Sequence, residues 1–356
     1  MSHDDKIAIF PASGGISGGT YRHLADLIDA RRLILVSRHP EKIDPKYAAG
    51  GAAVRRGDYE RAEALEGAFA GARVLSLVSH ASVSHRRRFG LHKAAIDAAV
   101  RAGVTHVFYS SLGFAGARDR PDHTVAHVMK AHLDTERYLA SLAAESDGKF
   151  TYTIVRQGLY TESFPLYLAF LDVARPPAQL PAEVRIPHPG TGPGIAWVKR
   201  DELGEATARL IARYTSPSSS SPEHDEPAER QRQRYRNATL LLSGPREISL
   251  GESAAIIGRV AGRSGGDIEV REVSVDEWAA QDCVRGVSPY LTVADGMDRA
   301  WATSWATSWD ALREGEGAAV TGHLRELLGR EPEAFETTVA AMVRAARQKE
   351  EGEVVA

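Results

Sequence analysis

The sequence predicts an α/β fold built on a doubly wound parallel sheet. Three features favour this fold class. Short apolar runs alternate with helical patterns through residues 1–158, the first run ends in a glycine-rich turn, and polar residues follow directly after most of the runs. Such repeated strand–helix units form a parallel sheet with right-handed crossovers.

Six strands are expected at the apolar runs, since strands buried on both faces have continuous apolar character. The runs cover residues 7–10, 33–36, 52–54, 74–78, 107–109 and 152–155. Polar residues at their carboxyl ends, among them Ser110, Ser111 and Gln157, should line one crevice, because ligands of parallel sheets bind beyond those ends.

The remainder of the chain is less regular. Residues 159–214 and 238–345 are expected to form a smaller α/β lobe for the substrate, adding in part to the sheet, with residues 164–173 helical. Residues 215–237 are rich in Ser, Pro, Glu, Gln and Arg, which predicts a disordered polar insertion. Three tryptophans, Trp301, Trp305 and Trp309, recur with a four-residue step and should pack this lobe onto the sheet.

Composition narrows the class of protein. With a formal charge of −3, the protein has no excess of positive charge that would indicate binding to nucleic acid. The one basic run, Arg86–Arg88, is interpreted as a solvated helix face, with a phosphate contact as the alternative. A single cysteine, Cys283, and a polar start that leaves no room for a signal peptide predict a cytoplasmic protein, and no apolar run approaches membrane-spanning length.

The glycine-rich turn predicts a phosphate site. A strand, a turn of small residues and a helix N-terminus present free N–H groups to an anion. Of the spacing G-x-x-G-x-x-G only Gly14 is in register, with Pro11 and Ser17 at the other two positions. Pro11 lacks an N–H group, so its position must need no donor. A ligand-free glycine loop is the alternative.

The end of the second strand indicates which dinucleotide binds. About twenty residues after the turn, where an NAD site carries a carboxylate for the ribose, the chain has Ser37 and Arg38. These two side chains suit a 2′-phosphate, so the sequence predicts NADP(H). A solvated role for Arg38 is the alternative.

Together with the Gly57-Asp58 pair, the strand end Ser110–Gly113 and the segments 126–136 and 197–204, these motifs resemble the NmrA-like family of atypical short-chain dehydrogenases/reductases, above all its fungal members. The resemblance spans most of the chain and implies a Rossmann fold that binds NADP(H). The family includes reductases and redox-sensing regulators without turnover, and its fungal members often serve small-molecule biosynthesis.

The resemblance also implies roles for individual residues. The turn would contact the pyrophosphate, Arg38 the 2′-phosphate, Asp58 and Tyr59 the adenine, and Ser79 and His80 the nicotinamide ribose. With Gln157 at a strand end, the expected cofactor residues are Pro11, Ala12, Ser13, Gly14, Gly15, Ile16, Ser17, Arg38, Asp58, Tyr59, Ser79, His80 and Gln157.

The catalytic set departs from that of ordinary short-chain dehydrogenases, which use a serine and a Tyr-x-x-x-Lys pair. Ser110 or Ser111 can be that serine, but Val128 stands at the tyrosine position and His132 at the lysine position. His132, whose charge is expected to change near neutral pH, can bind the ribose or donate a proton. Tyr160 is a further candidate donor.

A metal site is not expected. His123, His127 and His132 are spaced by four and five residues, so one helix face cannot hold all three.

Two functions remain open. The first is an NADPH-dependent oxidoreductase that reduces a carbonyl or conjugated double bond of a small, mostly apolar metabolite. Residues 158–194 would wall its pocket with apolar side chains, namely Tyr160, Phe164, Leu166, Tyr167 and Phe170. The second is a redox sensor that binds NADP(H) and signals to a protein partner, which the missing Tyr-x-x-x-Lys pair favours.

Overall fold

Seven parallel strands form the main sheet, in the spatial order β3-β2-β1-β4-β5-β6-β8. A computed structural model describes residues 5–114, 120, 122–216, 228–285 and 299–354. The strands are β1 (Lys6–Phe10), β2 (Leu33–Ser37), β3 (Ala53–Arg56), β4 (Ala72–Val78), β5 (His106–Leu112), β6 (Thr151–Gln157) and β8 (Ala238–Leu242). The predicted α/β fold class is therefore confirmed, and the chain adds β8 to the six strands expected. The order reverses between β1 and β4, which opens a crevice beyond their carboxyl ends.

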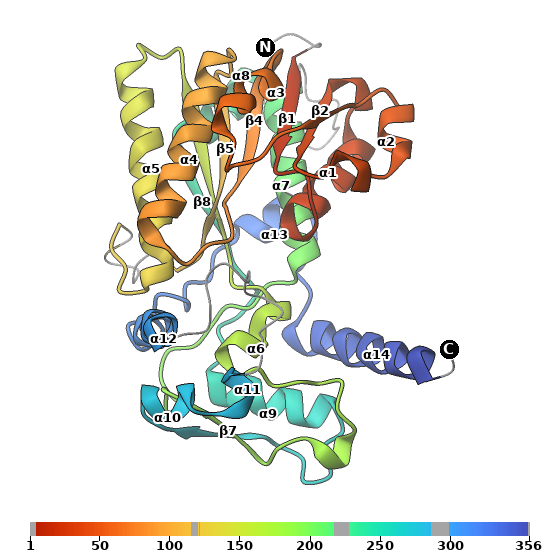
Figure 1. Ribbon diagram of the computed structural model, residues 1–356, viewed down its shortest axis with the longest axis vertical. Coiled ribbons are helices and arrows are strands. Elements are labelled where there is room, and N and C mark those ends of the chain that lie inside the picture. Colours follow the sequence, from red (N-terminus) through yellow and green to blue (C-terminus); the bar gives the residue numbers. More distant parts are fainter. Residues whose placement is uncertain (1–4, 115–119, 121, 217–227, 286–298, 355–356) are drawn as a thin grey trace.

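Helices cover both faces of this sheet (Figure 1). On one face, Ile7 and Ile9 of β1 pack with α1 (Gly15–Leu27), α7 (Arg200–Thr215) and α13 (His323–Leu328). On the other, Ala8 and Phe10 pack with α3 (Leu65–Phe69), α4 (His85–Arg101) and α5 (His127–Glu145). Because neighbouring residues of a strand point to opposite faces, a strand between two helix layers must be apolar at every position. The short helix α2 (Pro45–Ala49) lies between β2 and β3.

A smaller lobe lies below the carboxyl ends of the strands in Figure 1. Its two-stranded parallel sheet pairs β7 (Glu183–Ile186) with β9 (Glu269–Glu272). Its helices are α6 (Phe164–Tyr167), α9 (Leu250–Val260), α10 (Val275–Ala279), α11 (Asp282–Arg285), α12 (Arg299–Arg313) and α14 (Phe335–Val354). Trp301, Trp305 and Trp309 of α12 are buried in the core of this lobe, which agrees with a packing role, and Trp305 also lines a pocket, as the alternative of a ligand surface requires.

Two expectations for the chain after residue 158 are wrong. Residues 200–214 belong to the sheet domain and not to the lobe, because α7 packs against α1 and shares its core. The predicted helix over residues 164–173 ends at Tyr167, and Ala169 and Phe170 adopt positive φ. The contact of α7 with α1, at Gly204 and Gly19, joins residues far apart in the chain and leaves no local pattern in the sequence.

The predicted disorder of residues 215–237 is also wrong for its last third. Residues 228–235 form α8 (Ala228–Tyr235), and Tyr235 is buried against the core beneath α7. Arg232 is buried as well and donates to the carbonyl oxygens of Tyr214 and Ser216 at the end of α7. The alkyl stem of an arginine can cover apolar surface while its guanidinium satisfies helix carbonyls, which composition alone does not reveal. Residues 217–227 lie outside the described part.

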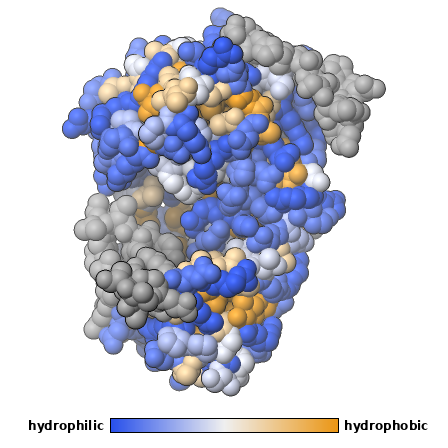
Figure 2. All heavy atoms as spheres, turned by 90° about the vertical axis from the view of Figure 1, so that its right-hand side faces the viewer, coloured by the Kyte–Doolittle hydropathy of each residue, from blue (hydrophilic) through white to orange (hydrophobic). Residues whose placement is uncertain are grey.

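Figure 2 shows one face of the molecule, mostly hydrophilic, with hydrophobic side chains gathered in separate patches on the sheet domain and on the lobe. Among the described helices, none is long and apolar enough to cross a bilayer.

Candidate functional site

A pocket of about 670 Å³ opens at the carboxyl ends of β1, β2 and β4. This volume lies within the range of small-molecule and cofactor sites, about 300–1,000 Å³. Ten of the predicted cofactor residues line it: Pro11, Ala12, Ser13, Gly14, Ser17, Arg38, Asp58, Tyr59, Ser79 and His80. The parallel sheet thus brings together residues that lie up to about seventy positions apart in the chain.

The turn after β1 fits a pyrophosphate. The N-cap of α1 is Gly14, no side chain caps this end, and a β-carbon at Gly14 or Gly15 would meet nothing within 4 Å. The first N–H groups of the helix are therefore open to an anion. Ser17 closes the turn by donating its hydroxyl to the carbonyl oxygen of Pro11, at 2.6 Å. This bond satisfies the carbonyl of Pro11 and joins the turn to the first residues of α1.

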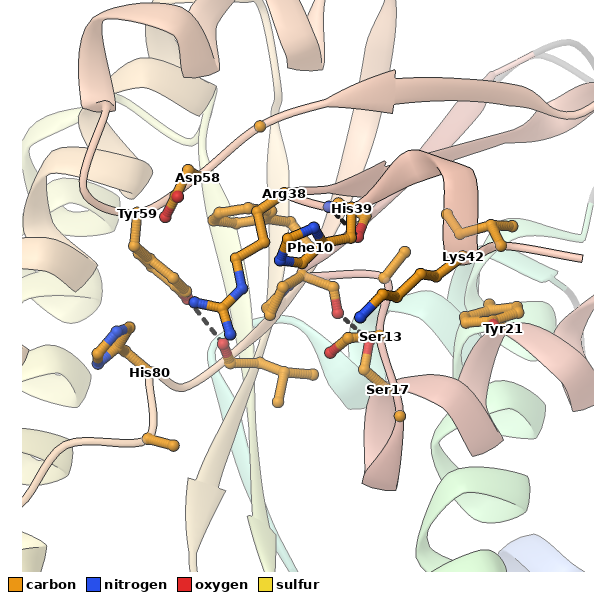
Figure 3. A pocket seen from close by; sticks show the side chains of 18 of the residues that line it. Phe10, Ser13, Ser17, Tyr21, Arg38, His39, Lys42, Asp58, Tyr59 and His80 are labelled. Atoms are coloured by element: carbon orange, nitrogen blue, oxygen red, sulfur yellow. Dashed lines mark hydrogen bonds between the residues drawn. The ribbon is translucent and has the colours of Figure 1, made fainter. Parts of the chain in front are cut away.

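Two cations reach into the pocket from the end of β2 (Figure 3). Arg38 extends toward Tyr59, and Lys42, from the turn Pro40–Lys42, extends toward Ser13. Within the part of the chain that the structure describes, neither side chain forms an ion pair or hydrogen bond with the protein. The hydroxyl of Ser37 accepts the amide of His39 at 3.1 Å and keeps its own proton to donate. Such a group of unpaired donors suits a phosphate.

The turn after β3, with Gly57, Asp58 and Tyr59, forms the opposite wall of the pocket. A β-carbon at Gly57 would lie 2.4 Å from a methyl carbon of Val36, so only glycine fits there. The Asp58 carboxylate accepts the amide of Glu60 at 3.1 Å. The buried Tyr59 donates its hydroxyl to the carbonyl oxygen of Val78 at 2.7 Å, which ties this turn to β4.

Three predicted cofactor residues lie elsewhere. Gly15 begins α1 with φ +68° and lies beside the pocket without lining it. Ile16 is buried in the core between α1 and the sheet. Gln157 is fully buried and donates to the hydroxyl of Thr207 on α7 at 3.2 Å. Neighbouring residues at the start of a helix point in different directions, so Gly15 and Ile16 do not face the pocket together with Gly14 and Ser17.

Sequence reasoning missed other residues that line this pocket, namely Phe10, Tyr21, His39, Lys42, Ile43 and Ala81. Lys42 carries no sequence signal of its own, because its position depends on the short turn after His39.

A second pocket, of about 220 Å³, adjoins the first and shares Val78, Ser79 and Ala81 with it. The four predicted catalytic residues, Ser110, Ser111, His132 and Tyr160, all line this second pocket. Its walls are mostly apolar and include Leu112, Val128, Leu159, Leu166, Tyr167 and Trp305. Of the five wall residues expected from residues 158–194, Phe164 and Phe170 instead pack in the lobe core.

The two serine candidates differ in what they contact. Ser111 donates its hydroxyl to the Glu136 carboxylate at 2.5 Å, and Glu136 also forms a partly buried ion pair with Arg156 at 2.6 Å. Ser110 forms no side-chain hydrogen bond within the described residues, and 8% of its surface is exposed. The structure therefore leaves the hydroxyl of Ser110, and not that of Ser111, available to a ligand.

The interpretation of Arg86–Arg88 as a solvated face is wrong for Arg88, which is 9% exposed and lines the second pocket. It donates to the hydroxyl of Ser79 and to the carbonyl oxygen of Val128, at 3.3 Å for the latter. A signal was present in the sequence. Arg88 lies four residues before the buried His92, on the helix stripe that continues with Ile96 and Ala99.

His132 is almost fully buried, and its Nδ1 atom lies 3.0 Å from the hydroxyl of Tyr109. Burial lowers the pKa of His132 well below its ordinary value, and the nearby Arg88 lowers it further. The expectation that its charge changes near neutral pH is therefore wrong, since desolvation keeps the imidazole neutral there.

Comparisons with known proteins agree with this geometry. Residues 14–166 match the NAD(P)H-binding family. An NmrA-like family domain-containing oxidoreductase of Aspergillus flavus is 28% identical over 331 residues, which covers 92% of this chain and 91% of that protein.

Solved structures share the fold. The NADPH-dependent quinone oxidoreductase QOR2 of Escherichia coli has a TM-score of 0.69 at 24% identity, over 94% of this chain and 99% of that one. The triphenylmethane reductase of Citrobacter sp. has the same TM-score and identity, over 94% and 98%. NmrA, a negative transcriptional regulator, has a TM-score of 0.64 at 15% identity, over 98% of both chains.

Residues 14–166 thus match an NAD(P)H-binding family, and the sheet to which they contribute, together with β1 and β8, is Rossmann-like. The predicted cofactor class is confirmed. The resemblance of this chain to the NmrA-like family, predicted from its sequence, is confirmed.

Proposed function

We propose that this protein is an NADPH-dependent oxidoreductase that reduces a carbonyl or a conjugated double bond of a small, mostly apolar metabolite. The observation that carries this proposal is the junction of the two pockets at Val78, Ser79 and Ala81. A dinucleotide held by the turn after β1 and extended to Ser79 would present its nicotinamide at the mouth of the apolar pocket. When bound there, the reduced nicotinamide supplies a hydride.

The preference for NADPH over NADH rests on Arg38 and Lys42. Both cations line the larger pocket without protein partners among the described residues. No carboxylate stands directly after β2 to bind a ribose 2′-hydroxyl, and Glu41, four residues after its end, pairs with His39 and Arg56 and does not line the pocket. A 2′-phosphate would satisfy both through charge-assisted hydrogen bonds.

The residues of the second pocket define what the substrate can be. Its apolar walls accept a ring or a short chain, whereas Ser110, His132 and Tyr160 offer a few polar contacts that can orient one oxygen. The names of the A. flavus relative and of the quinone and triphenylmethane reductases support a reductase. A cytoplasmic location and a role in small-molecule biosynthesis are part of this proposal.

The test is to titrate NADPH and NADH by fluorescence and then to follow the loss of NADPH absorbance with quinones, enones and aldehydes. We expect tighter binding of NADPH than of NADH, and turnover with at least one of these carbonyl classes.

The alternative function is a redox sensor that binds NADP(H) without turnover. Val128 at the position of the usual tyrosine favours it, because no phenol lies there to protonate a product. Tight NADPH binding by a protein that reduces none of these compounds would favour the sensor.

A further inference from the structure

The second pocket contains a buried cation that no carboxylate of the described residues neutralises. Among the described residues, Arg88 has only the hydroxyl of Ser79 and the carbonyl oxygen of Val128 as hydrogen-bond partners, and its Nε atom is buried without one. A buried charge is costly unless it is paired. The guanidinium therefore lacks an anion, and the space available for one is the pocket that it lines.

A chain of buried hydrogen bonds ends in the same pocket. The backbone amide of His80 donates to Nε2 of His92 at 2.9 Å, so that nitrogen must be unprotonated. The proton of neutral His92 therefore resides on Nδ1, which lies 3.2 Å from the hydroxyl of Tyr109 and 3.0 Å from that of Thr135. Thr135 donates its own proton to the carbonyl oxygen of Ala131 at 2.7 Å.

One proton lies between the hydroxyl of Tyr109 and Nδ1 of His132, which are 3.0 Å apart. When Tyr109 donates this proton, His132 accepts at Nδ1 and carries its own proton on Nε2. That Nε2 atom is buried, has no hydrogen-bond partner in the described part of the chain, and belongs to a residue that lines the second pocket.

We propose that Arg88 and His132 form an anion site in the substrate pocket, which binds the substrate oxygen on which negative charge develops. His92 and Tyr109 are positioning residues that hold the Nε2–H donor of His132 toward that oxygen. The proposal rests on the proposed function and narrows its substrate class to conjugated carbonyl compounds, such as quinones and enones, whose reduced oxygen is a stabilised anion.

The electron balance shows why such a site is needed. When a hydride adds to carbon, the displaced π pair of the substrate moves to its oxygen, and the resulting oxyanion takes a proton from water to complete the product. Arg88 and His132 would stabilise the oxyanion by hydrogen bonds until that proton arrives. A neutral imidazole donor beside a guanidinium can thus replace the absent phenol at Val128.

The electrostatic surroundings keep both donors in the required state. The groups that face His132 are Arg88 and His92 from α4, Tyr109 from β5 and Arg156 from β6. Burial lowers the pKa of His92 and His132 and raises that of Tyr109, so all three stay neutral at physiological pH. Burial also lowers the pKa of Arg88, but arginine is not deprotonated in proteins, so the guanidinium stays charged.

The first experiment uses 4-nitrophenol, a single-ring phenol that ionises near neutral pH and whose anion absorbs visible light. Its affinity is measured as phenol and as phenolate, without a cofactor and with NADP⁺. We expect wild type to favour the phenolate, and Arg88→Met to weaken phenolate binding by about 10- to 100-fold while neutral phenol changes less than about twofold. Arg87→Met is the matched control, because Arg87 lies on the same helix but pairs with Glu60 on the surface.

The second experiment observes the tautomer itself and does not depend on a stable Arg88 variant. Proton–nitrogen correlation spectra of histidine-labelled protein distinguish Nε2–H from Nδ1–H, and His132→Gln identifies the signal. We expect an Nε2–H tautomer in wild type and its loss, with weaker phenolate binding, in Tyr109→Phe. Tyr138→Phe is the control, since the hydroxyl of Tyr138 bonds to Asp97 outside both pockets.

The results separate this proposal from the proposed function. If phenolate binding is absent in wild type, or unchanged in Arg88→Met and Tyr109→Phe, the anion site is wrong even if quinones are reduced. If phenolate binding depends on Arg88 and Tyr109 while no carbonyl compound is reduced, the anion site stands and the reductase proposal fails. An Nδ1–H tautomer of His132 in wild type would overturn the positioning roles.

Discussion

Gly204 of α7 lies against Gly19 of α1, so close that a β-carbon at Gly204 would be 2.9 Å from the Cα of Gly19. The contact joins two helices that are about 180 residues apart in the chain, and it brings α7 onto the face of the sheet next to the phosphate-binding turn. The position of α1, and with it the N-terminus that faces the cofactor pocket, depends on this contact.

We expect Gly204→Ala to destabilise the fold. The added methyl must separate α1 from α7, and overpacking of this kind costs about 1–3 kcal/mol, more than the gain of about 1 kcal/mol in helix propensity. Gly67→Ala in α3 is the control, because a β-carbon there meets nothing within 4 Å. Urea unfolding checks both variants, and a Gly204→Ala protein as stable as wild type would contradict the close contact.

We expect Arg38→Ala to weaken NADPH binding by about 1.5–3 kcal/mol, since a charge-assisted hydrogen bond to the 2′-phosphate is lost. NADH affinity should stay within about twofold. Lys42→Ala should act in the same direction. Arg31→Ala is the control, because Arg31 pairs with Asp29 outside the pocket. Fluorescence titration with both cofactors measures the effect, and an equal loss for NADPH and NADH would disprove it.

The two serines after Tyr109 should affect different properties. Ser110→Ala should lower the turnover of any substrate found, because its hydroxyl faces the second pocket without a protein partner in the described chain. Ser111→Ala should instead lower the free energy of unfolding by about 1–3 kcal/mol, since the partly buried Glu136 carboxylate loses a donor. Steady-state kinetics and unfolding curves of both variants test this division, and the reverse pattern would refute it.

Arg232→Ala should destabilise the protein by about 2–3 kcal/mol, because the carbonyl oxygens of Tyr214 and Ser216 lose charge-assisted donors. Arg234→Ala is the matched control on the same helix, since its ion pair with Glu326 is exposed and worth at most about 1 kcal/mol. Thermal unfolding of the two variants gives the comparison. If Arg232→Ala had the same melting temperature as the control, the hydrogen bonds from Arg232 to the end of α7 would not stabilise the fold.

Stability should fall on acidification through the buried histidines. Burial lowers the pKa of His92, His106 and His132 well below the ordinary value. Below about pH 6.5 the unfolded chain therefore binds protons that the native state excludes, and stability decreases as pH falls toward the lowered native pKa values. Each such proton contributes about 1.4 kcal/mol per pH unit.

His106→Gln tests this linkage, because His106 lies outside both pockets, between Thr151 and Thr153. Between about pH 5.5 and 6.5, the variant should lose stability less steeply than wild type, by up to about 1.4 kcal/mol per pH unit. Urea unfolding at a series of pH values measures both slopes, and identical slopes would contradict the prediction.

The sequence by itself determined the sheet, the phosphate-binding turn and the position of Arg38. These features follow from local chemistry, because a strand covered on both faces must be apolar and a turn that approaches an anion needs small residues. The rule that ligands bind beyond the carboxyl ends of parallel strands then placed Asp58, Ser79 and Ser110 along one crevice, although no local pattern links them.

Only the tertiary structure decided which side chains of those segments face the ligand and which groups they meet. Ile16 and Gln157 are buried in the core, and Lys42 reaches the pocket through one short turn. The helix stripe of α4 marks Arg88 as buried, but only the tertiary structure shows that it meets Ser79 and Val128. The state of His132 depends on His92 and Tyr109, which are distant in sequence. Hydrogen-bond direction and desolvation arise from such three-dimensional neighbours, so no local pattern in the sequence can specify them.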